Sequence, residues 1–474
     1  MNLLAMWTLR DLFLQEILRF SLCCRGFTFA LQVFFNILIP DHKADAFSPP
    51  RPPPSTTGDY LIELFLGGLG RWDAEHFLFI AEHGYLYEHN MAFFPLLPLL
   101  LVGLSKGPLW PMKWVLSTRS QLLLSAAVLN CACSALAGAV IYLLGCLVLQ
   151  NRRTAFLAAL LFCISPASIF MAATYSESLF ALSTFAGLWL LEKRKTLGCC
   201  LLLCLATSAR SNGLINVGFL LHTGARAIIQ GIGGLKRAIK MLMATLVVTL
   251  PFLFFQYYGY RSFCLPSPKE EIPQELLQLA IDKGYHARGT PPVWCFSSIP
   301  VAYSYLQSEY WGVGFLKYFQ LRQIPNFLLA MPVMVLGICT VWEYARANLH
   351  LFKTLGLWDI EKKPLSEYHG SRLFVYIVHF TFLMVFGILC MHVQVITRML
   401  FSSSPMLFWF CAYKIQKNEP WIWGLERGRF PSNPVLRLFR AWPSLRLQTK
   451  VLLGYFLGYW FIGTALHVNF LPWT

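Results

Sequence analysis

Apolar stretches long enough to cross a bilayer recur along the chain and alternate with polar segments. A helix needs about 20 mainly apolar residues to span the hydrocarbon core of a membrane. Three weaker stretches, at residues 93–104, 197–221 and 405–413, are short or interrupted by polar residues. The clear predicted spans are Phe20–Ile39, Gln121–Leu149, Ala155–Ala173, Leu179–Leu191, Met241–Tyr260, Asn326–Trp342, Leu373–Met391 and Val451–Phe470. We therefore predict an all-α multi-pass membrane protein with roughly 8–11 transmembrane helices, in which residues 1–474 form a single integral membrane domain.

The composition narrows the class of protein further. Hydrophobic residues make up 56% of the chain and charged residues only 13%, whereas soluble proteins average about 25% charged residues. This excludes a soluble multidomain enzyme and an intrinsically disordered chain. The formal net charge of +16 does not indicate a nucleic-acid partner, because Lys and Arg fall in short clusters between apolar stretches and form no continuous basic face.

The charges between the spans predict the orientation of the chain. Arg10, Arg19 and Arg25 lie at the N-terminal side of the first span, which acts as a signal anchor with its N-terminus in the cytosol. Residues 41–120 carry eight acidic and six basic side chains, whereas residues 414–450 carry two and eight. The positive-inside rule then predicts a cytosolic N-terminus (1–19), a first luminal loop (40–120), a second large luminal loop (261–325) and a basic cytosolic loop (414–450).

Most of the 14 cysteines lie inside apolar spans, where they serve as small apolar residues. Cys264 and Cys295 differ, because they share one polar loop. They would form a disulfide if that loop faces an oxidising lumen.

Ionisable side chains are densest in residues 71–85, RWDAEHFLFIAEHGY, which predict a short helix ended by Gly84. At 100° per residue, Asp73 and His76 share one face, whereas Glu75 lies on another. If Asp73 faces a cavity, His76 is its neighbour and Glu75 orients the helix at the headgroup level. An interfacial helix with solvated charges is an equal alternative. A metal site is not supported, since there is no HExxH pattern.

Polar side chains at membrane depth are functional candidates, because burying them in lipid is costly. Glu177, Arg210, His392 and Arg398 are the main examples. Each alone is better explained as a helix-end charge or an intramembrane hydrogen bond. Together with Asp73 they would form an anion-binding pocket at the luminal face. Such a pocket suits transfer of a sugar from a lipid-linked phosphate, in which a carboxylate takes a proton and cations stabilise the departing phosphate. We predict no cofactor and leave the requirement for a divalent metal open.

Several segments spread along the whole chain match the pattern of one known family. They are residues 39–42 (IPDH), 72–90 (WDAEHFLFIAEHGYLYEHN), 93–95 (FFP), 210–213 (RSNG), 263–266 (FCLP), 323–327 (QIPNF), 390–395 (CMHVQV) and 469–474 (NFLPWT). The longest of them, residues 72–90, is far more specific than a short motif. On these segments the chain resembles the PIG-V family of GPI mannosyltransferases II, and the similarity runs from end to end.

The resemblance implies a GT-C-like enzyme of the endoplasmic reticulum membrane with luminal loops and a luminal active site. It would transfer the second mannose, in α-1,6 linkage, from dolichyl-phosphate-mannose to a GPI-anchor precursor. A β-linked donor makes this an inverting reaction with one base. The acidic catalytic residue of GT-C enzymes lies in the first luminal loop, which here corresponds to Asp73, with Glu75 as the alternative.

These two lines of reasoning give one hypothesis for the site. Asp73 accepts the proton of the mannose 6-hydroxyl, and Glu75 and His76 position the acceptor. Charge and topology, rather than the resemblance, assign donor phosphate binding to Arg210, His392 and Arg398.

The predicted spans and the charge asymmetry also fit a protein of a different class. This alternative is a multi-pass lipid-linked-sugar transporter or a noncatalytic subunit of a GPI assembly complex. A transporter concentrates its ionisable groups near the membrane midplane, whereas the acidic cluster here lies in a predicted luminal loop. A transporter would form no new linkage, and a subunit would need another chain for activity.

Overall fold

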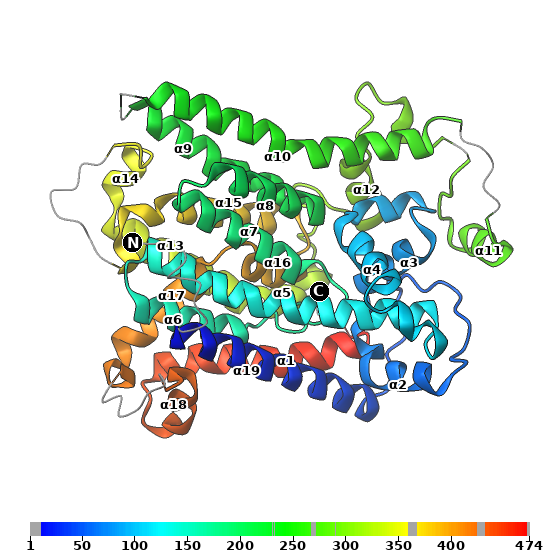
Figure 1. Ribbon diagram of the computed structural model, residues 1–474, viewed down its shortest axis with the longest axis horizontal. Coiled ribbons are helices and arrows are strands. Elements are labelled where there is room, and N and C mark those ends of the chain that lie inside the picture. Colours follow the sequence, from blue (N-terminus) through cyan, green and yellow to red (C-terminus); the bar gives the residue numbers. More distant parts are fainter. Residues whose placement is uncertain are drawn as a thin grey trace.

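The computed structural model describes residues 11–229, 231, 233–266, 272–289, 291–358, 367–423 and 432–471. Within these ranges the regular elements are all helices, and the only extended pairing is an isolated antiparallel bridge between Tyr87 and Ala287 (Figure 1). The predicted all-α fold class is confirmed. Parts of four predicted segments lie outside the described residues: the start of the N-terminus (1–10), residues 267–271 and 290 of the second luminal loop, residues 424–431 of the basic loop, and the end of the terminal matching segment (472–474).

Six helical segments among the described residues are long and apolar enough to cross a membrane. They agree with six of the clear predicted spans. A seventh would be the pair α16 (Val393–Ser403) and α17 (Met406–Asn418), which is bent by 77°. The six are α1 (Leu12–Leu38), α5 (Thr118–Val148), α10 (Gly234–Phe263), α13 (Ile324–Ala347) with the turn before it, α15 (Phe374–Cys390) with the turn before it, and α19 (Leu447–Val468).

Two of the eight clear predicted spans are not in this set, because their helices are short and buried. Residues 155–173 form α6 (Arg152–Cys163) followed by turns, and residues 179–191 belong to α7 (Glu177–Glu192). A helix of 12 residues such as α6 is about 18 Å long, whereas the hydrocarbon core is about 30 Å thick. Nearly every residue of α6 is buried within the protein. The apolar composition of these segments therefore reflects packing against other helices and not contact with lipid.

The three weaker apolar stretches are also helical. Residues 93–104 correspond to α4 (Leu96–Lys106), which has 11 residues and is too short to cross the bilayer. Residues 197–221 form α8 (Thr196–Ala209), the 3₁₀ turn η5 (Ser211–Asn216) and the start of α9 (Val217–Ile229). Residues 405–413 lie in α17.

Arg25 does not flank the first span as predicted. Helix α1 begins at Leu12, so Arg25 lies inside it and is 1% exposed. Its guanidinium donates hydrogen bonds to the carbonyl oxygens of Cys163 (2.7 Å) and Ser168 (2.8 Å), at and just beyond the end of α6. Carbonyls at a helix C-terminus lack partners within the helix and attract cations. Arg25 therefore closes the end of α6, whereas Arg19 has an exposed side chain.

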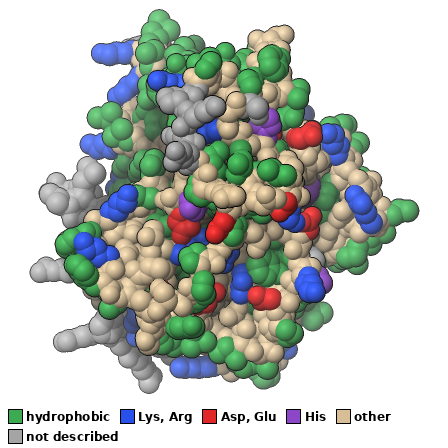
Figure 2. All heavy atoms as spheres, turned by 90° about the vertical axis from the view of Figure 1, so that its right-hand side faces the viewer, with side chains coloured by type: hydrophobic (Ala, Val, Ile, Leu, Met, Phe, Trp, Pro, Cys, Tyr) green, Lys and Arg blue, Asp and Glu red, His purple; other side chains and the backbone are tan. Residues whose placement is uncertain are grey.

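The segments predicted to be luminal gather at one end of the long helices. Helices α2 (Thr57–Leu66), α3 (Asp73–His83), α4 and α12 (Ala302–Trp311) lie at the right of Figure 1, and α11 (Gln274–Lys283) lies beyond them. Helix α18 (Pro434–Arg440), from the basic loop predicted to be cytosolic, lies at the opposite end, and so does α14 (Leu349–Lys353) (Figure 1). On the face of the molecule at the luminal-loop end, acidic and histidine side chains lie mostly in the centre and toward the right, whereas Lys and Arg are spread over the whole face (Figure 2).

Candidate active site

Helix α3 directs its first residue, Asp73, toward a cavity of about 340 Å³. The preceding residue, Trp72, has a φ of 58°, which is uncommon for a residue other than glycine. The backbone N–H of Asp73 donates a hydrogen bond to the hydroxyl of Tyr175 (3.2 Å). N–H groups in the first turn of a helix have no partner within the helix. This contact therefore stabilises the start of α3 and fixes the position of Asp73.

The cavity brings together side chains that are far apart in the sequence. Asp73 and His76 come from α3, Arg210 follows α8, and His392 and Arg398 belong to the start and the middle of α16. All five were singled out from the sequence. The structure therefore places the proposed base and the proposed phosphate-binding side chains around one cavity.

Two carboxylates and two guanidiniums form a connected cluster at this cavity. Arg398 Nη2 lies 2.7 Å from Asp73 Oδ2, and Arg398 Nη1 lies 3.6 Å from Glu177 Oε1. Arg210 Nη1 lies 2.5 Å from the same Glu177 oxygen. With each group in its usual state of ionisation the cluster has no net charge. Buried charges are stable only when paired in this way.

The cluster sets the protonation state of Asp73. Burial favours the neutral carboxyl, but the charge and the hydrogen bond of Arg398 outweigh it, and the pKa of Asp73 is lower than its ordinary value. Asp73 is therefore an ionised carboxylate at neutral pH and can accept a hydrogen bond from an acceptor hydroxyl.

The two histidines of the cavity are uncharged at neutral pH. Burial is the main cause that lowers the pKa of His76 and of His392 below the ordinary value. The His76 ring is stacked between the rings of Phe47 and Phe93, with distances between ring centroids of 4.4 Å and 4.3 Å. The His392 ring is stacked on the ring of Tyr318, with 4.4 Å between the ring centroids. Phe47 and Phe93 cover the two faces of the His76 ring, so the histidines contribute hydrogen-bonding nitrogens, and the positive charge of the cavity comes from the arginines.

Glu75 lies on the other face of α3, as the helical spacing predicted. Its side chain is 2% exposed and forms ion pairs with Arg51 and Arg119. Arg119 Nη1 also lies 4.0 Å from Glu82 Oε2. Glu75 is not among the described residues that line the cavity. Its carboxylate instead links α3 to the start of α5 and to the extended segment that contains Arg51.

The aromatic part of the cavity wall was not predicted from the sequence. Phe47 comes from the extended segment after α1, Phe93 precedes α4, and Tyr303 and Trp311 belong to α12. The available signal was the richness of residues 261–325 in aromatic side chains. That signal does not distinguish an aromatic side chain at a site from one at the membrane interface.

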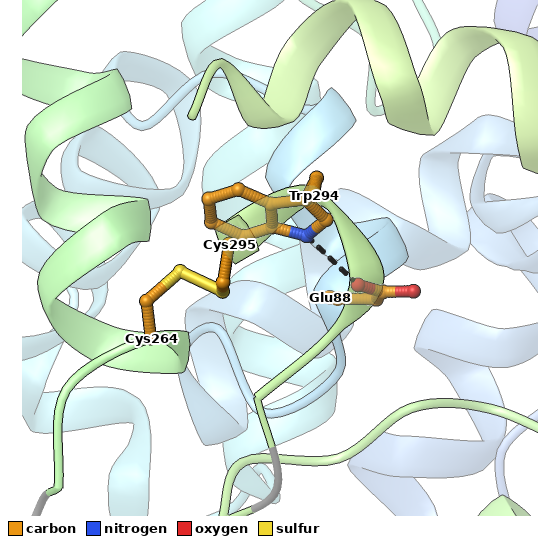
Figure 3. Close-up of a disulfide and its surroundings, with 4 residues drawn as sticks. All are labelled: Glu88, Cys264, Trp294 and Cys295. Atoms are coloured by element: carbon orange, nitrogen blue, oxygen red, sulfur yellow. Dashed lines mark hydrogen bonds between the residues drawn. A yellow bond between two sulfur atoms is a disulfide. The ribbon is translucent and has the colours of Figure 1, made fainter. Parts of the chain in front are cut away.

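The predicted disulfide is present and stabilises the part of the chain that carries α12. Cys264 at the end of α10 is bonded to Cys295 in η6 (Val293–Phe296). The neighbouring Trp294 donates a hydrogen bond from its indole nitrogen to Glu88 Oε2 (3.0 Å; Figure 3). Tyr310 donates to the other oxygen of Glu88 (2.7 Å). Glu88 therefore connects this segment to the turn that follows α3.

Potential metal ligands are dispersed. Within the described ranges, no group of three or more His, Cys, Asp or Glu side chains is placed to hold a metal ion.

The fold and the site define a multi-pass membrane protein with a paired carboxylate and arginine cluster at one end of its helices. A family model described as Mannosyltransferase (PIG-V) matches residues 14–474, and the chain belongs to this family. It is 49% identical to GPI alpha-1,6-mannosyltransferase 2 of Cricetulus griseus, over 99% of this chain and 100% of that protein. It is 48% identical to the Homo sapiens protein of the same name, over 97% and 98%. The predicted family and the predicted class of enzyme, a mannosyltransferase, are confirmed.

More distant relatives agree with this assignment. GPI mannosyltransferase 2 of Drosophila melanogaster is 30% identical over 97% of this chain and all of that protein. Among solved structures, an oligosaccharyltransferase of Archaeoglobus fulgidus is similar with a TM-score of 0.46 and 12% identity, over 95% of this chain and 55% of that protein. A TM-score of this size adds no weight, and the assignment rests on the sequence matches.

Proposed function

We propose that this chain transfers the second mannose, in α-1,6 linkage, from dolichyl-phosphate-mannose to a GPI-anchor precursor. The proposal is supported by the names of its full-length relatives. The single observation that carries the chemistry is the cluster at the cavity, in which Asp73 is paired with Arg398. It combines a proton acceptor with the cations that a phosphate leaving group needs.

The proposed reaction is a direct displacement with inversion at the anomeric carbon. The 6-hydroxyl oxygen of the acceptor mannose forms the new bond to that carbon, while the bond from the carbon to the phosphate oxygen breaks. The hydroxyl proton passes to Asp73, and the bonding electron pair leaves with dolichyl phosphate. Asp73 becomes neutral while the charge of the phosphate changes from −1 to −2.

The pairing of Asp73 with Arg398 couples these two changes. In the free enzyme part of the Arg398 charge is engaged by Asp73, 2.7 Å away. As Asp73 takes the proton, its attraction for Arg398 falls, and at the same moment the phosphate gains charge. The interaction between Arg398 and the phosphate is therefore stronger in the transition state than in the ground state, which is the condition for catalysis.

The remaining predicted side chains have supporting roles in this proposal. Arg210 binds the phosphate beside Arg398, and His392 donates or accepts a hydrogen bond as a neutral ring. The stacked ring of His76, with Phe47 and Phe93, forms a wall against which the acceptor sugar lies. Glu75 acts indirectly, by holding α3 through Arg51 and Arg119.

We place the active site in the lumen of the endoplasmic reticulum. The disulfide between Cys264 and Cys295 supports this side, since disulfides persist in oxidising compartments. The charge asymmetry between residues 41–120 and residues 414–450 supports the same orientation.

The test uses cells that lack the second GPI mannosyltransferase and accumulate the one-mannose precursor. Expression of the wild-type chain should convert this precursor and restore GPI-anchored proteins at the surface, and Asp73→Asn should do neither. Purified chain in proteoliposomes, given dolichyl-phosphate-mannose and the one-mannose acceptor, should form the two-mannose lipid without another protein. Absence of conversion by well-expressed wild type would refute the proposal. Conversion in cells but not by the purified chain would indicate a noncatalytic subunit.

A further inference from the structure

Glu177, the first residue of α7, contacts both arginines of the cavity. Its side chain is fully buried, and one oxygen lies 2.5 Å from Arg210 Nη1 and 3.6 Å from Arg398 Nη1. Arg210 and Arg398 belong to different parts of the chain, the end of α8 and the middle of α16. Glu177 is therefore the carboxylate that joins the two guanidiniums.

The position of Glu177 is fixed by contacts on both sides of it. Asn130 of α5 donates a hydrogen bond to the carbonyl oxygen of Tyr175 (3.0 Å) and accepts one from the hydroxyl of Ser178 (2.6 Å). Asn130 and Ser178 are both fully buried. A carboxylate in the first turn of a helix is further stabilised by the helix dipole. The backbone at Glu177 is therefore held in place, and the carboxylate reaches the two arginines from a fixed point on α7.

Two guanidiniums repel each other where water is scarce, and they remain adjacent only if an anion lies between them. We infer that Glu177 is a positioning residue that holds Arg210 and Arg398 side by side, so that both reach the phosphate of the lipid-linked donor. Glu177 itself touches no reacting atom. This inference rests on the proposed function, and it assigns the geometry of the phosphate site to the N-terminus of α7.

A simpler role for Glu177 would be to neutralise the two arginines without placing them. The substitution Glu177→Asp separates the two roles, because it keeps the charge and withdraws the carboxylate by one methylene group. A neutralising residue would tolerate this change. A positioning residue would not, since the attraction between buried charges falls with distance and the shorter side chain no longer reaches both guanidiniums.

The experiment compares wild type, Glu177→Asp and Glu177→Gln as purified protein in proteoliposomes. It measures KM for dolichyl-phosphate-mannose, kcat, and inhibition by dolichyl phosphate. The matched control is Glu192→Asp, at the other end of the same helix, where Glu192 Oε1 accepts a hydrogen bond from Tyr376 (3.0 Å). Folded protein is measured by size-exclusion chromatography and thermal unfolding in detergent.

For Glu177→Asp we expect KM for the donor and the inhibition constant of dolichyl phosphate to rise together by about tenfold, because the weakened ion pairs no longer hold both guanidiniums at the donor phosphate. We expect kcat to change much less and Glu192→Asp to match wild type. Wild-type values of KM for Glu177→Asp would overturn the inference in favour of neutralisation. Loss of folded protein in both Glu177 variants, with Glu192→Asp normal, would overturn it in favour of a purely structural role. Absence of transfer by wild type would instead refute the proposed function.

Discussion

Arg398 and Asp73 form an ion pair of 2.7 Å although they are 325 residues apart in the sequence. Arg398 is nearly buried, whereas the Asp73 side chain is 27% exposed. Asp73 is therefore the member of the pair that remains open to the cavity. This arrangement suits a carboxylate that must meet a substrate and a cation that must stay in place.

Asp73→Asn is expected to reduce kcat by about a thousandfold, the contribution of a well-placed general base. The amide keeps the shape of the side chain but cannot accept the proton. The measurement is transfer of mannose by purified protein under saturating substrates, normalised to folded protein.

Glu75→Gln is the matched control, because Glu75 is a carboxylate two residues away on the other face of α3. Its ion pairs with Arg51 and Arg119 are lost, and breaking a buried pair costs about 3 kcal/mol of folding free energy. We expect a lower thermal midpoint, with kcat per folded molecule close to wild type. The reverse pattern, with Glu75→Gln inactive and Asp73→Asn active, would assign the base to Glu75.

Many residues of the site could be predicted from the sequence, because ionisable residues are rare in so apolar a chain. The spacing on α3 correctly separated Asp73 from Glu75, since the helical period is a local property. The contact between Asp73 and Arg398 could not be predicted, because it depends on how the fold places α16 relative to α3. Glu177 was noticed as a polar residue at membrane depth, but its position between two arginines is also a result of packing.

The errors in the fold have a related cause. Residues 155–173 were predicted to be one continuous span because buried helices and lipid-facing helices have similar apolar compositions, whereas they form the 12-residue α6 followed by turns. Arg25 was predicted to flank a span because a charge beside an apolar stretch usually marks its end. Its partners are carbonyl oxygens at the end of α6. No local sequence pattern predicts a hydrogen bond from a side chain of one helix to the carbonyl oxygens of a distant one.

Arg398→Lys is expected to lower kcat/KM by about a hundredfold, although the charge is kept. The guanidinium reaches Asp73 with one nitrogen and Glu177 with another, and a lysine ammonium is a single point charge that cannot do both. The control is Arg19→Lys, because the Arg19 side chain is 72% exposed. Equal activity of the two variants would show that charge alone is required at position 398.

Cys264→Ser is expected to lower the free energy of unfolding by roughly 3–4 kcal/mol, as estimated for a disulfide that closes a loop of this size. The bonded cysteines are separated by 31 residues. Since the disulfide restrains the segment leading to α12, KM should also rise. Thermal unfolding in detergent, with and without a reductant, measures the first effect. Cys339→Ser, which removes an exposed free thiol, should behave as wild type, and equal midpoints for the two variants would contradict the prediction.

His89 is expected to make the folded protein sensitive to acid. It is 3% exposed, and neither ring nitrogen has a hydrogen-bond partner in the described part of the chain. Its ring packs among Tyr87, Tyr285 and Tyr310. Burial, and to a lesser degree the nearby His76, lower the pKa of His89 well below its ordinary value.

The direction of the pH effect follows from the lowered pKa of His89. Below an ordinary histidine pKa of about 6.5, His89 binds a proton in the unfolded chain but not in the folded protein. Lowering the pH therefore stabilises the unfolded state relative to the folded state. His89→Phe removes this effect and loses no hydrogen bond. At pH 7 the variant should unfold near the wild-type temperature, and at pH 5 it should be more stable than wild type by roughly 2 kcal/mol. His42→Phe, at an exposed position, should keep the wild-type pH dependence. An identical fall in stability between pH 7 and pH 5 for His89→Phe and wild type would show that His89 takes no part in it.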